Sequence, residues 1–195
     1  MIKIGILGDI GSGKSFLANS FGYPVFNADE EVNKLYKSDK KIYNKLKKIL
    51  PKFFQKFPIE KYQIINAILD KKQNLKKIVN IVHKEVRKKL RIFLKKNSHK
   101  KIVILDIPLL LENRINKKKY ILIFVQSKRS DVLRRLKKRK NFNQNLLNIF
   151  RKIQLPLDYK KKKSNYIFKN DFRKATVKKY VRVITREILG WKKLY

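Results

Sequence analysis

The sequence predicts an α/β protein in which helices cover both faces of a central parallel sheet. Two continuous apolar runs, Ile102–Leu105 and Tyr120–Val125, have the composition of central strands that are buried on both sides. Stretches with helical periodicity separate the apolar runs, and strands that alternate with helices form doubly wound parallel sheets. A third observation is the first apolar run, Ile2–Leu7, which leads into a glycine-rich turn and is predicted as a short buried strand.

The other predicted elements of the sheet and its covering layers are short. After Gly22, a strand is expected at Tyr23–Phe26, and a last strand is expected at Tyr166–Phe168. Helices are expected at three places: Lys14–Phe21, Ser130–Lys140 and Val177–Leu189.

From Glu30 to about Lys100 the pattern is helical, which is more chain than a crossover between two strands requires. Apolar residues recur there at steps of three and four, as at Leu75, Ile78, Val82, Val86 and Leu90. We therefore expect a core made of residues 1–29, 101–135 and 164–195, a helical insertion at 30–100 and a small lid at 136–163.

The net charge of the 195-residue chain is +38, from 52 Lys and Arg against 14 Asp and Glu. A polyanionic partner, such as nucleic acid, an anionic membrane or phosphorylated metabolites, is one explanation. Compositional drift is the other, and we favour it because the basic residues are spread along the chain rather than gathered in one stripe.

The cysteine and histidine counts exclude several classes of chemistry. No Cys is present, so disulfides, thiolate zinc sites and cysteine nucleophiles are excluded, which fits a cytoplasmic protein. Only His83 and His99 are present, so a histidine metal cluster is not expected. The first apolar run is too short for a signal peptide or a membrane span.

The string Gly8-Asp-Ile-Gly11-Ser12-Gly13-Lys14-Ser15 fits the Walker A pattern in full, after a predicted strand and before a predicted helix. In such a P-loop the glycines let the backbone turn its N–H groups toward phosphate oxygens, and the helix N-terminus adds positive charge. Lys14 can reach the β- and γ-phosphates of ATP, and the Ser15 hydroxyl can bind Mg²⁺. The short chain, the N-terminal position of the loop and the lack of a guanine-specifying Asn-Lys-x-Asp favour a small-molecule kinase.

Two aspartates follow predicted strands, at the sheet edge where open α/β sheets bind ligands. Asp29 can deprotonate an attacking hydroxyl or hold Mg²⁺ through water, but it can also be a helix N-cap. Asp106 is either a Walker B-like aspartate that contacts Mg²⁺ through water or a cap of Pro108–Glu112. The residues alone leave these alternatives open.

A basic predicted helix carries Arg134, Arg135 and Arg139, and Arg151 and Gln154 follow in the stretch beyond it. Arg135 and Arg139 are four residues apart and share one face of the predicted helix. On a mobile flap, such arginines can neutralise charge on a transferred phosphoryl group and exclude water. A solvated basic face is the alternative for any one of them.

In their order and spacing, these strings resemble the dephospho-coenzyme A kinase family over nearly the whole chain. Gly8–Ser15 resembles the family's Thr-Gly-Gly-Ile-Gly-Ser-Gly-Lys-Ser/Thr, and Asn27-Ala-Asp29 resembles its Asp-Ala-Asp. Asp106–Glu112 is similar to Asp-Val-Pro-Leu-Leu-Phe-Glu, the most distinctive string. Val82-His83 resembles Ile-x-His-Pro, and Ser164–Asn170 resembles Ala-Asp-Tyr-Val-Ile-x-Asn. The chain departs from the family pattern at Asn27, Lys84, Ser164 and Asn165.

The resemblance implies a three-layer P-loop NTPase fold and the last step of coenzyme A biosynthesis: ATP and 3′-dephospho-CoA give ADP and coenzyme A. It implies Mg²⁺ with Ser15 as its ligand, Asp29 as general base, and Lys14 and Arg139 as further catalytic residues. The insertion at 30–100 would bind the acceptor. The expected acceptor-binding residues are Asp29, His83, Asp106, Pro108 and Leu109.

The expected partners are therefore ATP and dephospho-CoA, with no specific nucleic acid and no membrane, and the chain is expected to be a monomer or a weak homo-oligomer. Two alternatives remain. One is another P-loop kinase of the nucleoside monophosphate or shikimate type. The other is a basic nucleic-acid-binding protein that a nucleotide regulates, although the sequence contains no recognisable nucleic-acid module.

Overall fold

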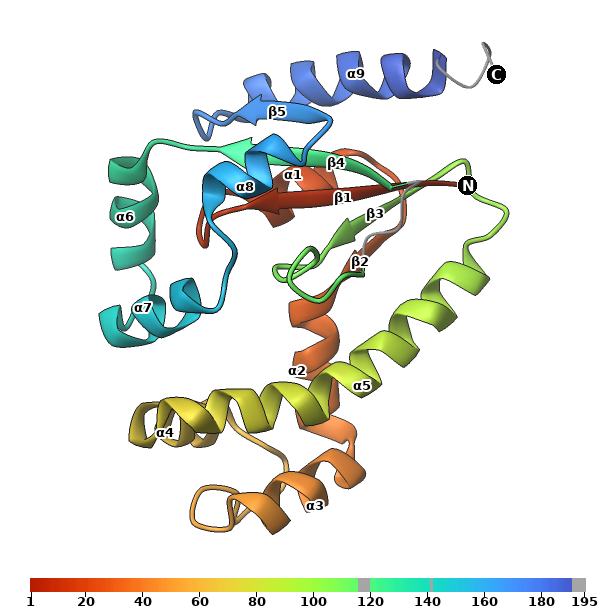
Figure 1. Ribbon diagram of the computed structural model, residues 1–195. Helices are drawn as coiled ribbons and strands as arrows, with labels where there is room; N and C mark the ends of the chain where they lie inside the picture. The colour runs from red at the N-terminus through yellow and green to blue at the C-terminus, as the bar shows by residue number, and fades with distance from the viewer. Residues whose placement is uncertain (116–119, 141, 191–195) are drawn as a thin grey trace. The chain divides into compact units, whose positions relative to one another are not determined.

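The structure is a computed structural model that describes residues 1–115, 120–140 and 142–190 (Figure 1). The chain divides into two compact units. The sheet unit holds Met1–Asn27, Asn97–Phe142 and Gln154–Tyr195, and the helical unit holds Ala28–Lys96 and Asn143–Ile153. Position 141 of the predicted lid, and positions 116–119 and 191–195 of the predicted core, lie outside the described residues.

Five parallel strands form the sheet in the order β2-β3-β1-β4-β5 (Figure 1). They are β1 Ile2–Gly8, β2 Val25–Asn27, β3 Ile102–Asp106, β4 Tyr120–Gln126 and β5 Tyr166–Lys169. The runs predicted as central strands, β3 and β4, both pair with β1: Gly5 lies opposite Leu105 on one side and Leu122 on the other. The predicted α/β class with a parallel sheet is confirmed, and all five strands end at the same edge.

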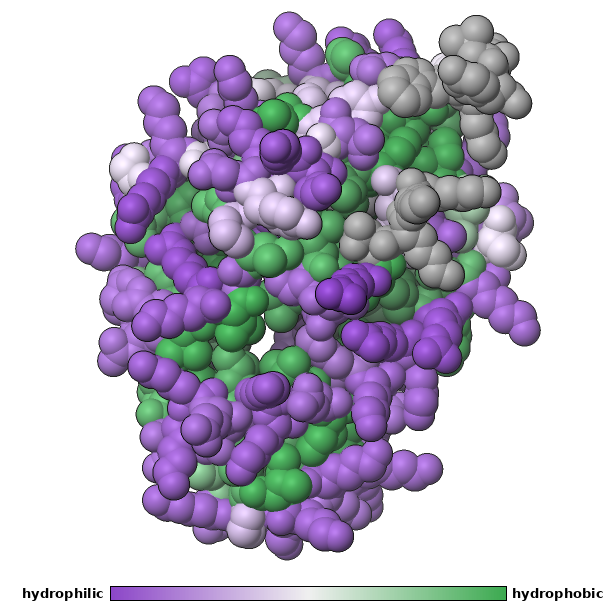
Figure 2. Space-filling model, in the orientation of Figure 1, coloured by the Kyte–Doolittle hydropathy of each residue, from purple (hydrophilic) through white to green (hydrophobic). Residues whose placement is uncertain are grey.

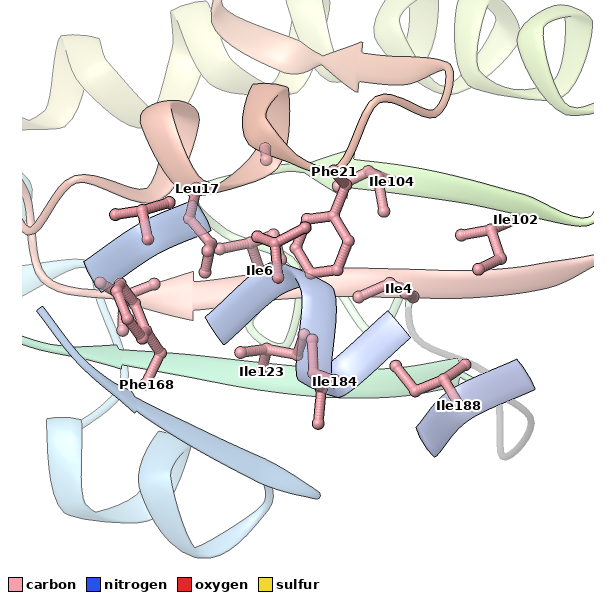
Figure 3. Packing of buried hydrophobic residues seen from close by; sticks show 14 residues of the cluster. Ile4, Ile6, Leu17, Phe21, Ile102, Ile104, Ile123, Phe168, Ile184 and Ile188 are labelled. Carbon is pink, nitrogen blue, oxygen red and sulfur yellow. The ribbon is translucent and has the colours of Figure 1, made fainter. Parts of the chain in front are cut away.

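Helices α1 (Lys14–Ser20) and α9 (Lys174–Gly190) pack on one face of the sheet (Figure 3). Apolar residues from both helices bury the alternate strand residues that point to this face; they include Leu17, Phe21, Ile184 and Ile188 with Ile4, Ile6, Ile104 and Ile123. On the opposite face, a Cβ at Gly5 would lie 2.5 Å from Cδ2 of Leu110, so this position has no room for a side chain. Helices α6 (Arg129–Lys137) and α8 (Leu157–Lys162) complete the unit.

The helical unit consists of α2 Ala28–Ser38, α3 Lys40–Ile49, α4 Lys61–Asp70, α5 Lys72–Lys96 and α7 Gln144–Lys152. The long helix α5 packs against α2, α3 and α4, and α4 also packs against α7. Its predicted apolar stripe is buried at every position: Leu75, Ile78, Val82, Val86 and Leu90. This stripe of spacing three and four explains why the stretch folds as a helix with one covered face.

Some predicted element ends differ from the structure. The helix predicted at Ser130–Lys140 ends at Lys137, because Arg139 and Lys140 follow Leu136 where the buried face would have to continue. Beyond it lies the unpredicted helix α7, which the side chain of Asn143 caps by accepting a hydrogen bond from the Leu146 N–H at 2.9 Å. Residues 136–163 are divided between the two units, and their action as a lid stays a prediction.

Hydrophilic side chains predominate on the face that Figure 2 shows. Along α5, every lysine and arginine is exposed, while the apolar stripe is buried. In the described part of the chain, none of the helices combines the length and the hydropathy that a membrane span needs.

Candidate nucleotide and acceptor site

The predicted phosphate-binding loop lies between the end of β1 and the start of α1. Among the glycines that its backbone requires are Gly11 and Gly13, where φ is +81° and +95°, in the region that L side chains rarely adopt. A Cβ at Gly13 would also lie 2.5 Å from Nδ2 of Asn170, and one at Gly11 would lie 2.9 Å from the side chain of Leu136. The loop therefore has the backbone conformation that its Walker A spacing predicts.

Lys14 lies over this loop as the first residue of α1. Its ammonium group donates to the carbonyl of Asp9 at 2.7 Å and to the carbonyl of Gly8 at 3.3 Å. Ser15 follows with an exposed side chain, whereas Ser12 is buried. A cation at the loop and an exposed hydroxyl next to it fit the triphosphate of a nucleotide.

Asn27 and Asp106 lie directly opposite each other at the ends of β2 and β3. The Asn27 amide donates to Oδ2 of Asp106 at 3.3 Å, and Asp106 is buried. The residues after Asp106 form turns rather than a helix, so Asp106 is not a helix cap, and the Walker B-like interpretation remains. Pro108 and Leu109 lie in these turns and are half-buried.

Glu112, which ends the most distinctive sequence string, is held in the interior of the sheet unit. Its Oε1 lies 2.7 Å from the ammonium of Lys160 and accepts a hydrogen bond from the Leu155 N–H at 2.9 Å. Lys160 also donates to Oε1 of Gln154 at 3.0 Å. Gln154 thus takes part in a buried polar network, a role that its place in the predicted lid did not indicate.

The predicted arginines lie in different surroundings. Arg135 lies on α6, with its guanidinium 4.4 Å from the ring centroid of Phe172. Arg139 lies beyond the end of α6 and is exposed, so the prediction that it shares a helix face with Arg135 is wrong. Arg134 is also exposed and pairs with Asp131 at 2.8 Å, which fits a solvated basic face.

Sequence reasoning missed two residues that contact the phosphate loop. Ser127 follows β4 and Asn170 follows β5, and both donate a hydrogen bond to the carbonyl of Ser12. The available signal was their position: polar residues at the carboxyl ends of parallel strands lie at the ligand-binding edge.

Asp29 and His83 belong to the helical unit. Asp29 is the second residue of α2 and is exposed, so it is not the N-cap, although it lies in the first turn with Glu30 and Glu31. Three acidic residues there interact favourably with the positive end of the helix. His83 is half-buried on α5, beside the buried Val82.

Charged groups at or near the phosphate loop include Asp9 and Lys14 within it and Asp171 after β5. Asp171 follows Asn170 and is exposed; the Arg173 N–H and then the Thr176 hydroxyl, which both donate to its carboxylate, lower its pKa. Among the described residues, no group of three or more His, Cys, Asp or Glu is arranged to hold a metal ion.

A parallel sheet with this strand order, a Walker A loop after β1 and a paired acidic residue at the end of β3 define a P-loop kinase. The comparisons with known proteins narrow this class. The family described as dephospho-CoA kinase matches residues 2–175, so the chain belongs to the dephospho-CoA kinase family.

Individual relatives agree with this assignment. The dephospho-CoA kinase of Wolbachia sp. subsp. Brugia malayi is 34% identical over 186 residues, which cover 93% of this chain and 95% of the relative. The crystal structure of TT1252 from Thermus thermophilus matches with a TM-score of 0.73 and 25% identity over 95% of this chain and 97% of that one. The dephospho-CoA kinase from Campylobacter jejuni has the same fold, with a TM-score of 0.64 and 21% identity over 95% and 96% of the two chains.

The predicted family, fold class and kinase activity are thereby confirmed. The chain is an ATP-dependent kinase of dephospho-CoA, and the match favours this activity over the shikimate and nucleoside monophosphate kinases considered as alternatives.

Proposed function

We propose that this chain transfers the γ-phosphate of ATP to the ribose 3′-hydroxyl of dephospho-CoA, with Asp29 as the base that accepts the hydroxyl proton. The phosphate loop supports the nucleotide half of this proposal. The Lys14 ammonium already lies over the loop, within hydrogen-bond distance of two of its carbonyls, and a bound triphosphate would offer it stronger, charged acceptors.

Mg²⁺ completes the proposed site, with the Ser15 hydroxyl as its protein ligand. When bound, it would neutralise charge that develops on the β- and γ-phosphates. The donor set fits this ion, because Mg²⁺ commonly keeps several waters and binds through substrate phosphates and only one or two protein oxygens. Asp106, which accepts a hydrogen bond from the Asn27 amide at the ends of β2 and β3, would accept a further one from a water bound to Mg²⁺.

Five residues would contact the acceptor: Asp29, His83, Asp106, Pro108 and Leu109. Asp106 ends β3 and is buried, and Pro108 and Leu109 follow it with half-buried side chains; together they offer the mixed apolar and polar surface that a long substrate requires. Arg139 is exposed and would neutralise charge on the transferred phosphoryl group. We further propose that the protein acts in the cytoplasm as a monomer or weak homo-oligomer.

The experiment is a substrate panel on the full chain. ADP release is measured with ATP, Mg²⁺ and each of dephospho-CoA, shikimate and a nucleoside monophosphate, with and without added RNA. Of the three acceptors, we expect only dephospho-CoA to give fast ADP release. RNA should not change the rate, and chelation of Mg²⁺ should abolish the activity. Faster release with another acceptor would contradict the assigned substrate, and a dependence on RNA would favour the regulated nucleic-acid-binding protein.

A further inference from the structure

The carbonyl of Ser12 accepts two hydrogen bonds from residues that are distant in sequence. The Asn170 amide donates to it at 2.8 Å and the Ser127 hydroxyl donates at 2.9 Å. The Asn170 bond is buried: Asn170 is 7% exposed and Ser12 is 1% exposed. Both lone pairs of one phosphate-loop carbonyl are therefore used by side chains of the fold.

The sheet places these two donors side by side. Strands β4 and β5 are parallel partners, and Gln126 pairs with Lys169 at their carboxyl ends. Ser127 directly follows β4, and Asn170 directly follows β5. The Asn170 N–H donates a hydrogen bond to the Gln126 carbonyl at 2.8 Å. The two donors thus come from the rigid end of the sheet, and the loop is held against it.

A trans peptide joins Ser12 to Gly13, since the described residues have a cis bond only at Phe57-Pro58. In a trans peptide the C=O and the following N–H point in opposite directions. A Ser12 carbonyl that is fixed toward β4 and β5 therefore turns the Gly13 N–H away from them. The contact also explains Gly13, where a Cβ would lie 2.5 Å from the Asn170 amide nitrogen.

We propose that Asn170 and Ser127 are positioning residues that aim the Gly13 N–H at nucleotide phosphate. This inference rests on the proposed nucleotide site and names the residues that fix the orientation of one peptide in its phosphate loop. Neither side chain touches the nucleotide in this scheme; each acts through the Ser12–Gly13 peptide. If both donors are absent, this peptide can rotate, and one phosphate donor is lost from the loop.

Full-length Ser127→Ala, Asn170→Ala and the double variant test the inference, with Asn165→Ala as a matched control. Asn165 lies just before β5, and its side chain accepts a hydrogen bond from the Leu122 N–H at 2.8 Å, far along the strand from the phosphate loop. Ser127→Ala is the cleaner single variant, because Asn170 also accepts from the Phe172 N–H at 2.9 Å. The probes are tripolyphosphate, which has no base, and ADP, both followed by calorimetry.

Each single variant should weaken tripolyphosphate and ADP binding about fivefold, the equivalent of one ordinary hydrogen bond. The double variant should lose more than the product of the two, because one remaining donor still holds the carbonyl. In turnover, KM for ATP should rise while KM for dephospho-CoA stays unchanged. Asn165→Ala should lower the melting temperature but leave both affinities at the wild-type value.

The three possible negative results have different meanings. If wild-type protein binds ADP and tripolyphosphate, and folded Ser127→Ala and double variants bind them equally well, the positioning role is wrong. Affinity losses in Asn165→Ala as large as in the other variants would also overturn it. If wild-type protein binds neither probe, the proposed nucleotide site itself is contradicted.

Discussion

The ammonium group of Lys160 lies 2.7 Å from a carboxylate oxygen of Glu112, with the two side chains only 1% and 11% exposed. Glu112 belongs to the segment after β3, and Lys160 lies on α8. Their network includes Gln154 and the Leu155 N–H, which are the first residues after the helical segment Asn143–Ile153. The pair therefore fixes the point at which the chain re-enters the sheet unit.

Lys160→Met is expected to destabilise the protein by about 3–5 kcal/mol, because it leaves the Glu112 carboxylate buried without its cation. The measurement is the midpoint of urea unfolding. Lys88→Met is the matched control: Lys88 pairs with Glu85 at 3.0 Å but is 63% exposed, so its loss should cost less than about 1 kcal/mol. Equal costs for the two variants would show that the Lys160 pair is not buried in solution.

A second prediction concerns the contact between Asn27 and Asp106. Asn27→Asp would bring a second carboxylate next to that of Asp106. At about pH 8 the two negative charges repel each other, so the melting temperature should fall. At about pH 5 the melting temperature should recover, because a proton shared by the two carboxylates can restore the hydrogen bond. Asn27→Ala loses the bond without adding charge, and its deficit should be the same at both pH values. A deficit of Asn27→Asp that does not vary with pH would argue against a direct contact.

Asp29→Asn tests the proposed base. It should lower the turnover number by about 10²–10⁴ and change ATP affinity little, since the amide cannot accept the hydroxyl proton. Glu30→Gln is the control, because it removes the same charge from the same exposed first turn of α2. A defect that excess Mg²⁺ rescues would move Asp29 to the metal site, and an unchanged turnover number would refute the base assignment.

Lys14→Ala should abolish phosphoryl transfer and leave the protein folded, because the hydrogen bonds that Lys14 donates to the carbonyls of Gly8 and Asp9 stay within the loop. Turnover and the melting temperature are measured together. Lys34→Ala serves as the control, since Lys34 is exposed and its ammonium pairs with Glu31 of the same helix at 2.6 Å. Near-normal turnover of Lys14→Ala would contradict the proposed role of the phosphate loop.

The net charge of +38 leads to a prediction about nucleic acid. If this charge has no dedicated partner, binding to duplex DNA or RNA should be weak, without sequence preference, and should fall steeply with salt. Fluorescence anisotropy with labelled duplexes at several salt concentrations measures this. Tight and sequence-selective binding at physiological salt would instead indicate a function in nucleic-acid recognition.

Local signals explain what the sequence predicted well. The apolar run Ile2–Leu7 and the glycines that follow it predict a strand and a phosphate loop from a short stretch of sequence. The phosphate loop and Lys14 could therefore be predicted without any information from the rest of the chain. The same holds for α5, whose apolar stripe repeats over many turns.

The unpredicted features depend on contacts between distant segments. Nothing local shows that Ser127 and Asn170 meet at Ser12, because this follows from the pairing of β4 with β5. Nor does a run of four lysines, 160–163, show which one is buried; Lys160 is selected by Glu112, which lies 48 positions earlier in the chain. Helix α7 did have a local signal, the Asn143 cap before Leu146, which the surrounding polar residues obscured.

The identity of the phosphorylated product tests the central claim most directly. Purified protein is incubated with ATP, Mg²⁺ and dephospho-CoA, and the product is analysed by phosphorus NMR. The account predicts stoichiometric ADP and a new phosphate monoester on the ribose 3′-oxygen of the acceptor. ATP hydrolysis without transfer, or a phosphate at any other position of the acceptor, would contradict it.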